Sequence, residues 1–170
     1  MLTSRKSFSL IEVLVFITIL SIFFILGASV VTVSLRNLKF NEHKIRAQHY
    51  STQLEEWLRV QRQIDWGGNL CRGCGSPANF TQTVTQQGNA ANNYRTTFCF
   101  NSSPIVGWQT LGPCSAYDLA PIFRREVIFT TTPVGNYVGQ VNATITLSWL
   151  EIGQVRSITT NTVFSVLEQR

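Results

Sequence analysis

Four cysteines are the residues of this 170-residue chain whose type and spacing could do chemistry. Cys71 and Cys74 form a Cys-x-x-Cys unit, and Cys99 and Cys114 follow later in the chain. A zinc ribbon would need a second Cys-x-x-Cys unit, but Cys99 and Cys114 are fifteen residues apart. No histidine lies close to the cysteines in the sequence to serve as a zinc ligand instead. A thioredoxin-like redox site would need a βαβ context, which the flanking sequence does not provide. Two disulfides are therefore favoured, with metal binding and free or redox thiols as the alternatives.

The histidines and the paired acids do not form a catalytic pattern. His43 and His49 are six residues apart and do not share one face of a helix, so we expect them to be solvated or to contact other protein chains rather than a metal. Glu55 and Glu56 are adjacent and point apart, which is unsuitable for acid/base catalysis. The sequence contains no phosphate-binding loop and no nucleophile with a matching base. We predict that the chain is not an enzyme and needs no cofactor.

A single carboxylate, Glu12, stands at the leading edge of a long apolar run. Val13–Leu35 contains 23 residues and no charge, and a helix needs about 20 residues to cross a bilayer core of ~30 Å. A charge deep in lipid costs about 2.5–3.5 kcal/mol, so such a residue is a functional hypothesis by default. Glu12 lies at one end of the run, however, where its carboxylate could reach the lipid headgroups at a smaller cost and have no specific role. The residues before it distinguish these interpretations.

A basic leader and a short motif precede the apolar run. The leader contains Arg5 and Lys6, Ser7 follows, and the motif reads Phe8-Ser9-Leu10-Ile11-Glu12. This arrangement resembles the class III signal of type IV pilins and pseudopilins, in which a small residue, usually Gly, precedes Phe-Thr-Leu-Ile-Glu. The chain departs from that pattern at Ser7, where Gly is commoner, and at Ser9, where Thr is commoner. The resemblance covers about 30 residues of the chain.

The resemblance implies how the chain is processed and assembled. In the family, the prepilin peptidase cuts before the Phe and methylates the new amino group, which places the cut between Ser7 and Phe8 and the methyl group on Phe8. Ser7 is small enough to permit this cut. The apolar helix is then kept, unlike a secretory signal peptide. Glu12 matches the family's Glu, which pairs with the terminal amine of a neighbouring pilin subunit.

The resemblance also bears on the cysteines and on the partners. Family members often close a variable loop with a disulfide, which favours Cys71–Cys74 and Cys99–Cys114 among three possible connectivities. The implied partners are other pilin subunits, the prepilin peptidase, the assembly machinery of the inner membrane and, before assembly, the lipid bilayer. Nucleic acid is unsupported, because the loops that could bind it contain only Arg72, with Arg95 just beyond.

Charge and composition agree with an exported domain of polar surface. Only 14% of the residues are charged, and the formal net charge is +5. Removal of Arg5 and Lys6 with the leader leaves about +3, which does not identify a partner. The basic leader predicts that the N-terminus stays in the cytoplasm and that the remaining chain crosses the inner membrane. The mature protein would then lie in the periplasm or in an extracellular filament.

Apolar periodicity predicts one long helix before the polar part of the chain. No proline occurs before Pro77, and apolar residues recur at steps of three and four as far as Ile64. We expect a bend or local unwinding at Gly27-Ala28-Ser29. The predicted domains are a cleaved leader at 1–7, a transmembrane or filament-core helix at 8–35, its amphipathic continuation at 36–66 and an exported, disulfide-containing β domain at 67–170.

The C-terminal half predicts an antiparallel sheet. Val141–Trp149 alternates strictly between apolar and polar residues, and Ile152-Gly153 is predicted to be a tight turn into the next strand. Asn101–Pro121 is predicted to be a loop, in which Trp108 either packs in the core or contacts another molecule. Further strands are expected at Tyr94–Phe100, Arg124–Thr132 and Gln154–Val166, with a short one around Phe80–Thr85. The predicted fold class is α+β, with the long helix packed on an antiparallel meander, as in pilins.

The favoured function is that of a structural subunit, minor rather than major, of a type IV pilus or a related filament. One alternative is a pseudopilin of type II secretion, which shares every N-terminal feature. Another is a filament-tip subunit that binds or adheres through the loops at Gly67–Asn93 and Asn101–Pro121.

Overall fold

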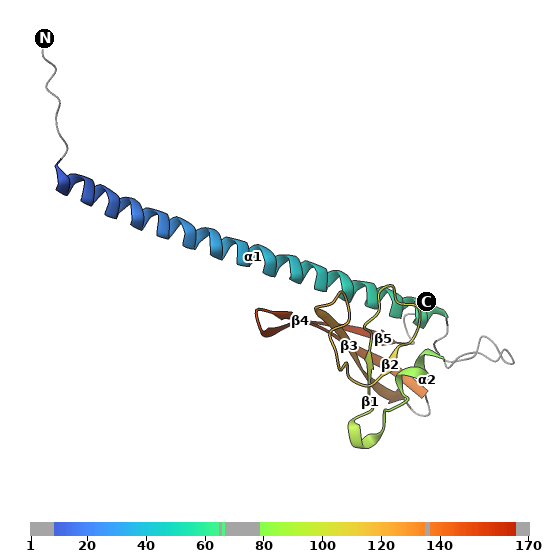
Figure 1. Ribbon diagram of the computed structural model, residues 1–170. Coiled ribbons are helices and arrows are strands. Elements are labelled where there is room, and N and C mark those ends of the chain that lie inside the picture. Colours follow the sequence, from blue (N-terminus) through green and yellow to red (C-terminus); the bar gives the residue numbers. More distant parts are fainter. Residues whose placement is uncertain (1–8, 65, 67–78, 135–136, 166–170) are drawn as a thin grey trace, which may run out of the picture. The chain divides into compact units, whose positions relative to one another are not determined.

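A computed structural model of the chain describes residues 9–64, 66, 79–134 and 137–165 (Figure 1). The elements are helix α1 (Leu10–Ile64), helix α2 (Phe80–Val84), a 3₁₀ turn (Ala90–Asn92), and strands β1 (Arg95–Cys99), β2 (Thr110–Leu111), β3 (Phe123–Val134), β4 (Tyr137–Glu151) and β5 (Gln154–Ser165). The chain divides into two compact units, Met1–Glu42 and His43–Arg170, and each is described by itself.

The five strands form one antiparallel sheet in the order β2-β1-β3-β4-β5. Strands β3, β4 and β5 are consecutive in the chain and in the sheet, so they form the meander that the sequence predicts. The C-terminal part of α1 packs on this sheet. The predicted α+β class, a long N-terminal helix with an antiparallel sheet, is therefore confirmed.

Strand β4 supplies one face of the core. Its odd-numbered residues from Val141 to Trp149 are all buried, as the alternating sequence predicts. The buried face continues on β3 with Val127 and Phe129 and on β5 with Phe164. A sheet with one apolar face needs a partner layer, and α1 provides it.

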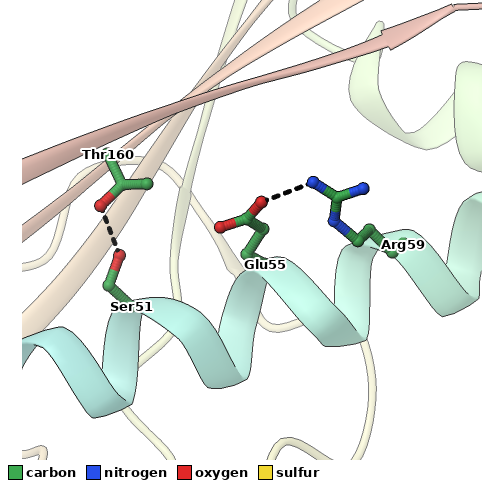
Figure 2. A network of polar contacts seen from close by, with 4 residues as sticks. All are labelled: Ser51, Glu55, Arg59 and Thr160. Atoms are coloured by element: carbon green, nitrogen blue, oxygen red, sulfur yellow. Dashed lines mark hydrogen bonds and ion pairs between the residues drawn. The ribbon is translucent and has the colours of Figure 1, made fainter.

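Helix α1 contributes a narrow stripe to this core. Ala47, Ser51, Leu54 and Leu58 are buried, at steps of four, three and four residues. Figure 2 shows that the Ser51 side chain points toward β5, where its hydroxyl lies 2.9 Å from the Thr160 hydroxyl. The stripe therefore fixes α1 against the strand at the edge of the sheet by packing and by one polar contact.

One turn beyond Ser51, the same helix carries an ion pair. Arg59 donates to Glu55 Oε1 at 2.8 Å (Figure 2). The acid precedes the base by four residues, which is the favourable order in a helix.

Further toward the N-terminus, α1 continues without interruption through Gly27-Ala28-Ser29. The local unwinding expected there does not occur, because no proline in this segment removes a backbone hydrogen bond of the helix.

One local prediction was wrong, and a second was incomplete. The segment expected to be a short strand around Phe80–Thr85 is helix α2, because Asn79 caps it by accepting a hydrogen bond from the Gln82 amide at 2.7 Å. This helix buries Phe80 and Val84 in the core. Within the expected loop Asn101–Pro121, Thr110–Leu111 forms the short strand β2. Both outcomes depend on contacts with β1 and with the core that periodicity does not reveal.

The turn between β4 and β5 carries an unusual residue. Ile152 has φ +48° and Gly153 has φ +73°, the pattern of a type I′ turn, in which Asn or Gly is normally preferred at the first position. A β-branched residue at positive φ is strained. We predict that Ile152→Asn raises the free energy of unfolding by about 1 kcal/mol.

Urea unfolding of the full chain would measure this change. Ile152→Val is the matched control, because it keeps a β-branched side chain at the same φ and should not restore the loss. An unchanged or lower urea midpoint for Ile152→Asn would contradict the assignment of strain to this turn.

Candidate functional site: an apolar helix with one carboxylate

The N-terminal part of α1 exposes an apolar surface on every side. Its large apolar residues between Leu10 and Leu38 are 41–86% exposed. Among the described residues, α1 is the one helix long and apolar enough to cross a membrane, and none of its most apolar stretch is buried within the chain. A helix that is apolar all round is stable in water only when something covers it, so lipid or other protein chains must do so.

Most hydroxyl groups of the apolar run bond to carbonyls of the helix itself. Val13–Leu35 contains five Ser or Thr residues. Four of their hydroxyls bond to carbonyls three or four residues earlier, at 2.7–2.9 Å: Thr18 to Val15, Ser21 to Ile17, Ser29 to Leu26 and Thr32 to Ala28. These groups need no water, which is the condition for burying them in hydrocarbon. The sequence prediction missed this feature, although hydroxyls within an apolar helix are its signal.

Glu12 lies in the first turn of α1, and it is exposed. The Glu12 and Val13 amides donate to the Ser9 carbonyl at 3.0 and 3.3 Å, so the helix begins directly after Ser9. The positive end of the helix dipole there favours a carboxylate. Among the residues that the structure describes, no cation forms an ion pair with Glu12. Ser7 and Phe8, the predicted processing residues, lie outside the described residues.

The second compact unit, His43–Arg170, is called the β unit below. It contains a buried cation that the sequence patterns did not single out. The Arg125 side chain on β3 is 0% exposed and donates four hydrogen bonds. Its acceptors are the carbonyls of Phe100, Tyr50 and Ser102, at 2.7–3.0 Å, and Gln53 Oε1, at 3.3 Å. Burial lowers the pKa of Arg125 to about 10, so the guanidinium stays charged at neutral pH. One side chain thus joins α1, the end of β1 and the loop after it.

Aromatic rings fill the space between α1, α2 and the sheet. Trp108, in the loop after β1, lies 5.2 Å from the Trp57 ring on α1 and 5.3 Å from the Phe98 ring on β1, measured between centroids. The loop therefore contributes a ring to the core, and Trp108 takes the packing role of the two that the sequence left open. This packing holds the base of the loop in place.

The same loop is closed by a disulfide between Cys99 and Cys114. Cys99 is the last residue of β1, and the Cys114 amide donates to Glu126 Oε2 on β3 at 3.2 Å. This is the pairing favoured for the loop, whereas Cys71 and Cys74 lie outside the described residues. The link crosses a loop of 15 residues.

We predict that replacing both Cys99 and Cys114 by Ser lowers the stability by about 3 kcal/mol, because the open loop gains entropy in the unfolded chain. Thermal unfolding of the full chain in detergent should then show a fall in Tm of roughly 10 °C. Reduction of the unchanged chain, which opens every disulfide, should lower the Tm by at least as much. A Tm equal to that of the oxidised chain would show that the link adds no stability.

His43 corrects the expectation that both histidines are solvated or contact other chains. It is partly buried, its ring lies 6.1 Å from that of Phe123, and its Nδ1 atom is 4.0 Å from Glu151 Oε1 at the end of β4. His49 is exposed and lies against Tyr50. Within the described part of the chain, no three His, Cys, Asp or Glu side chains are grouped so that they could hold a metal ion.

Comparisons with models of protein families, with curated proteins and with solved structures find no match for this chain. Its function is therefore inferred from its own residues and their arrangement.

Proposed function

We propose that this chain is a minor structural subunit of a type IV pilus or a related filament. The observation that carries the proposal is the combination at the N-terminus. An exposed carboxylate, Glu12, stands in the first turn of an exposed and otherwise uncharged apolar helix, directly after the Phe8-Ser9-Leu10-Ile11 motif. Such a helix needs a covering, first lipid and then the helices of neighbouring subunits. Glu12 would then pair with the terminal amine of a neighbour.

The β unit supports an exported location. Disulfides persist in oxidising compartments, and Cys99–Cys114 closes a loop of this unit. The basic residues Arg5 and Lys6 favour a cytoplasmic N-terminus. Together these features favour a single-pass protein of the inner membrane whose β unit faces the periplasm before assembly. We propose no enzymatic activity.

The decisive test is the N-terminal sequence and intact mass of the protein taken from its native envelope. We expect a chain that begins at Phe8 and carries one added methyl group. An intact Met1 in cells that contain the peptidase would reject the filament assignment and leave a membrane-anchored exported domain.

A second measurement separates the pilus from the secretion machine. Filaments sheared from the cell surface should contain the processed chain if it belongs to a pilus. A processed chain that stays with the envelope while type II secretion depends on it would instead assign the pseudopilin role, with the same Glu12 mechanism.

A further inference from the structure

Strand β5 lies at one edge of the sheet, and it has few of the features that normally protect an edge. It is 12 residues long, it contains no proline or glycine, and Arg156 is its single charge. It pairs with β4 along its whole length without a shift in register. The strand at the opposite edge, β2, has only two residues. Exposed edges are usually short or interrupted by charges, prolines or bulges, because a free edge binds other strands.

The hydrogen bonds of β4 show which backbone groups of β5 point outward. The Leu150 amide donates to the Ile122 carbonyl at 3.2 Å, on the β3 side of β4. Successive residues of a strand direct their backbone groups to opposite sides, so Glu151 points toward β5, where Gln154 is its partner. Gln154 and every second residue after it therefore bond to β4. The residues between them direct their amides and carbonyls away from the sheet: Val155, Ser157, Thr159, Asn161 and Val163.

A contact at the end of the strand agrees with this assignment. Ser165 continues the outward series, and its carbonyl accepts a hydrogen bond from Arg62 Nη2 of α1 at 2.7 Å. Among the residues that the structure describes, no group bonds to the outward amides and carbonyls between Val155 and Val163. This part of the edge thus presents alternating donors and acceptors at the spacing of a strand, which another extended backbone can match.

The side chains along the edge indicate what kind of strand fits it. Thr160 contacts Ser51 of α1, so the alternate residues Val155 and Val163 lie on the face away from the helix (Figure 2). These two valines are 57% and 53% exposed, and apolar side chains opposite them would cover them. Arg156 is exposed on the other face, and within the described part of the chain no carboxylate pairs with it. An acidic residue opposite Arg156 would add an ion pair.

We propose that the outer edge of β5, from Val155 to Val163, is a docking site for an extended segment of another protein. The segment would join the sheet as an antiparallel strand beside β5, the pairing that is slightly more stable per residue than the parallel one. It would carry an apolar residue opposite each valine and an acid opposite Arg156. A second copy of β5 would fit less completely, because β5 contains no acid. The inference uses contacts within the β unit alone and does not rest on the filament assignment.

Hydrogen exchange of the full chain in detergent, followed by NMR, tests whether the edge is free. The outward amides from Val155 to Val163 should exchange at least about a hundredfold faster than those of Ile158 and Thr160, which bond to β4. Equal protection of the two sets would show that the edge is already covered and would overturn the proposal. If that protection falls on dilution, the cover is a second copy of the chain.

The probe for docking is a capped nine-residue peptide with valine at both ends, glutamate before the C-terminal valine and threonine at the other positions. Paired antiparallel with β5, it places its valines opposite Val155 and Val163 and its glutamate opposite Arg156. We expect saturable binding that slows exchange of the outward amides by about tenfold or more. No added protection at millimolar concentrations of the peptide would overturn the proposal.

Two methylated peptides separate strand pairing from other modes of binding. The central threonine lies opposite Thr159 and directs its amide at β5, so a methyl group on that nitrogen should weaken binding by at least about tenfold. The next threonine directs its amide away from β5, and a methyl group there should change the affinity by less than about twofold. Equal affinities of the two peptides would overturn pairing along the backbone.

A substitution in the chain tests the same hydrogen bonds from the other side. Thr159→Pro removes one outward amide, and edge strands tolerate proline where the amide is not bonded to a neighbouring strand. This variant should lose binding of the unmethylated peptide, whereas the matched control Thr159→Val keeps the amide and should bind it. Equal binding by the two variants would contradict the proposal. If Thr159→Pro lowers the urea midpoint, the methylated peptides decide the question with the unchanged chain.

Discussion

Glu12→Gln is expected to reduce incorporation of the processed chain into filaments by about a hundredfold or more, while the β unit remains folded. Glutamine keeps the size of the side chain and removes only its charge. In the assembled core, the terminal amine of the neighbouring subunit would lose its partner. A buried charge left unpaired costs about 3–5 kcal/mol, and each 1.4 kcal/mol corresponds to about a tenfold change in an equilibrium.

The measurement is the amount of chain in sheared filaments relative to the amount in the membrane. Glu56→Gln is the matched control, because Glu56 is an exposed acid on the same helix but lies outside the apolar run. The membrane-bound variant should still begin at Phe8, so that a loss of incorporation is not a loss of processing. Wild-type incorporation of Glu12→Gln would reject the pairing role and leave Glu12 as an acid that stabilises the first helical turn.

The parts of the fold predicted from sequence are those in which local pattern and burial agree. Strand β4 alternates over nine residues, and each apolar position from Val141 to Trp149 is buried. The apolar run could be recognised because 23 consecutive residues without a charge match the length of a membrane-spanning helix. In both cases the pattern is long enough to outweigh the local preferences of single residues.

The parts that were missed depend on single contacts between distant segments. Helix α2 is five residues long, and its cap at Asn79 is the main local sign that it is a helix. His43 is partly buried against Phe123 and Glu151, which lie 80 and more residues away in the chain. The buried cation left a clearer signal. Arg125 occupies an inward position between Phe123 and Val127 in the alternation of β3, and a charge at such a position requires buried acceptors.

Arg125→Met is expected to lower the free energy of unfolding by roughly 4 kcal/mol or more, a large share of the stability of a domain of this size. Methionine matches much of the volume and removes the cost of burying a charge. The carbonyls of Phe100, Tyr50 and Ser102 remain, however, because no side-chain substitution removes them. Each buried acceptor left without a donor costs about 1–3 kcal/mol, so the unpaired carbonyls outweigh the relief of desolvation.

The neighbouring Arg124→Met is the matched control for this prediction. Arg124 lies on the opposite face of β3, with its guanidinium 5.0 Å from the centre of the Tyr117 ring, and a partly exposed contact of this kind contributes about 0.5–1 kcal/mol. Urea unfolding of the full chain, followed by Trp fluorescence, measures both variants. Equal losses for the two variants would show that the buried hydrogen bonds of Arg125 do not hold the unit together.

The pH dependence tests the same site independently. Burial lowers the pKa of Arg125 to about 10 in the folded chain, well below the ordinary value of a guanidinium. Below pH 10 the guanidinium is charged in both the folded and the unfolded state, so its contribution to stability does not change with pH. Above pH 10 the unfolded state binds the proton more tightly than the folded state does, so the cost of burying the charge is relieved only as the pH rises beyond that value. The difference in unfolding free energy between the wild type and Arg125→Met should therefore be constant from pH 6 to pH 9. If this difference changes with pH within that range, another titrating group shares the site.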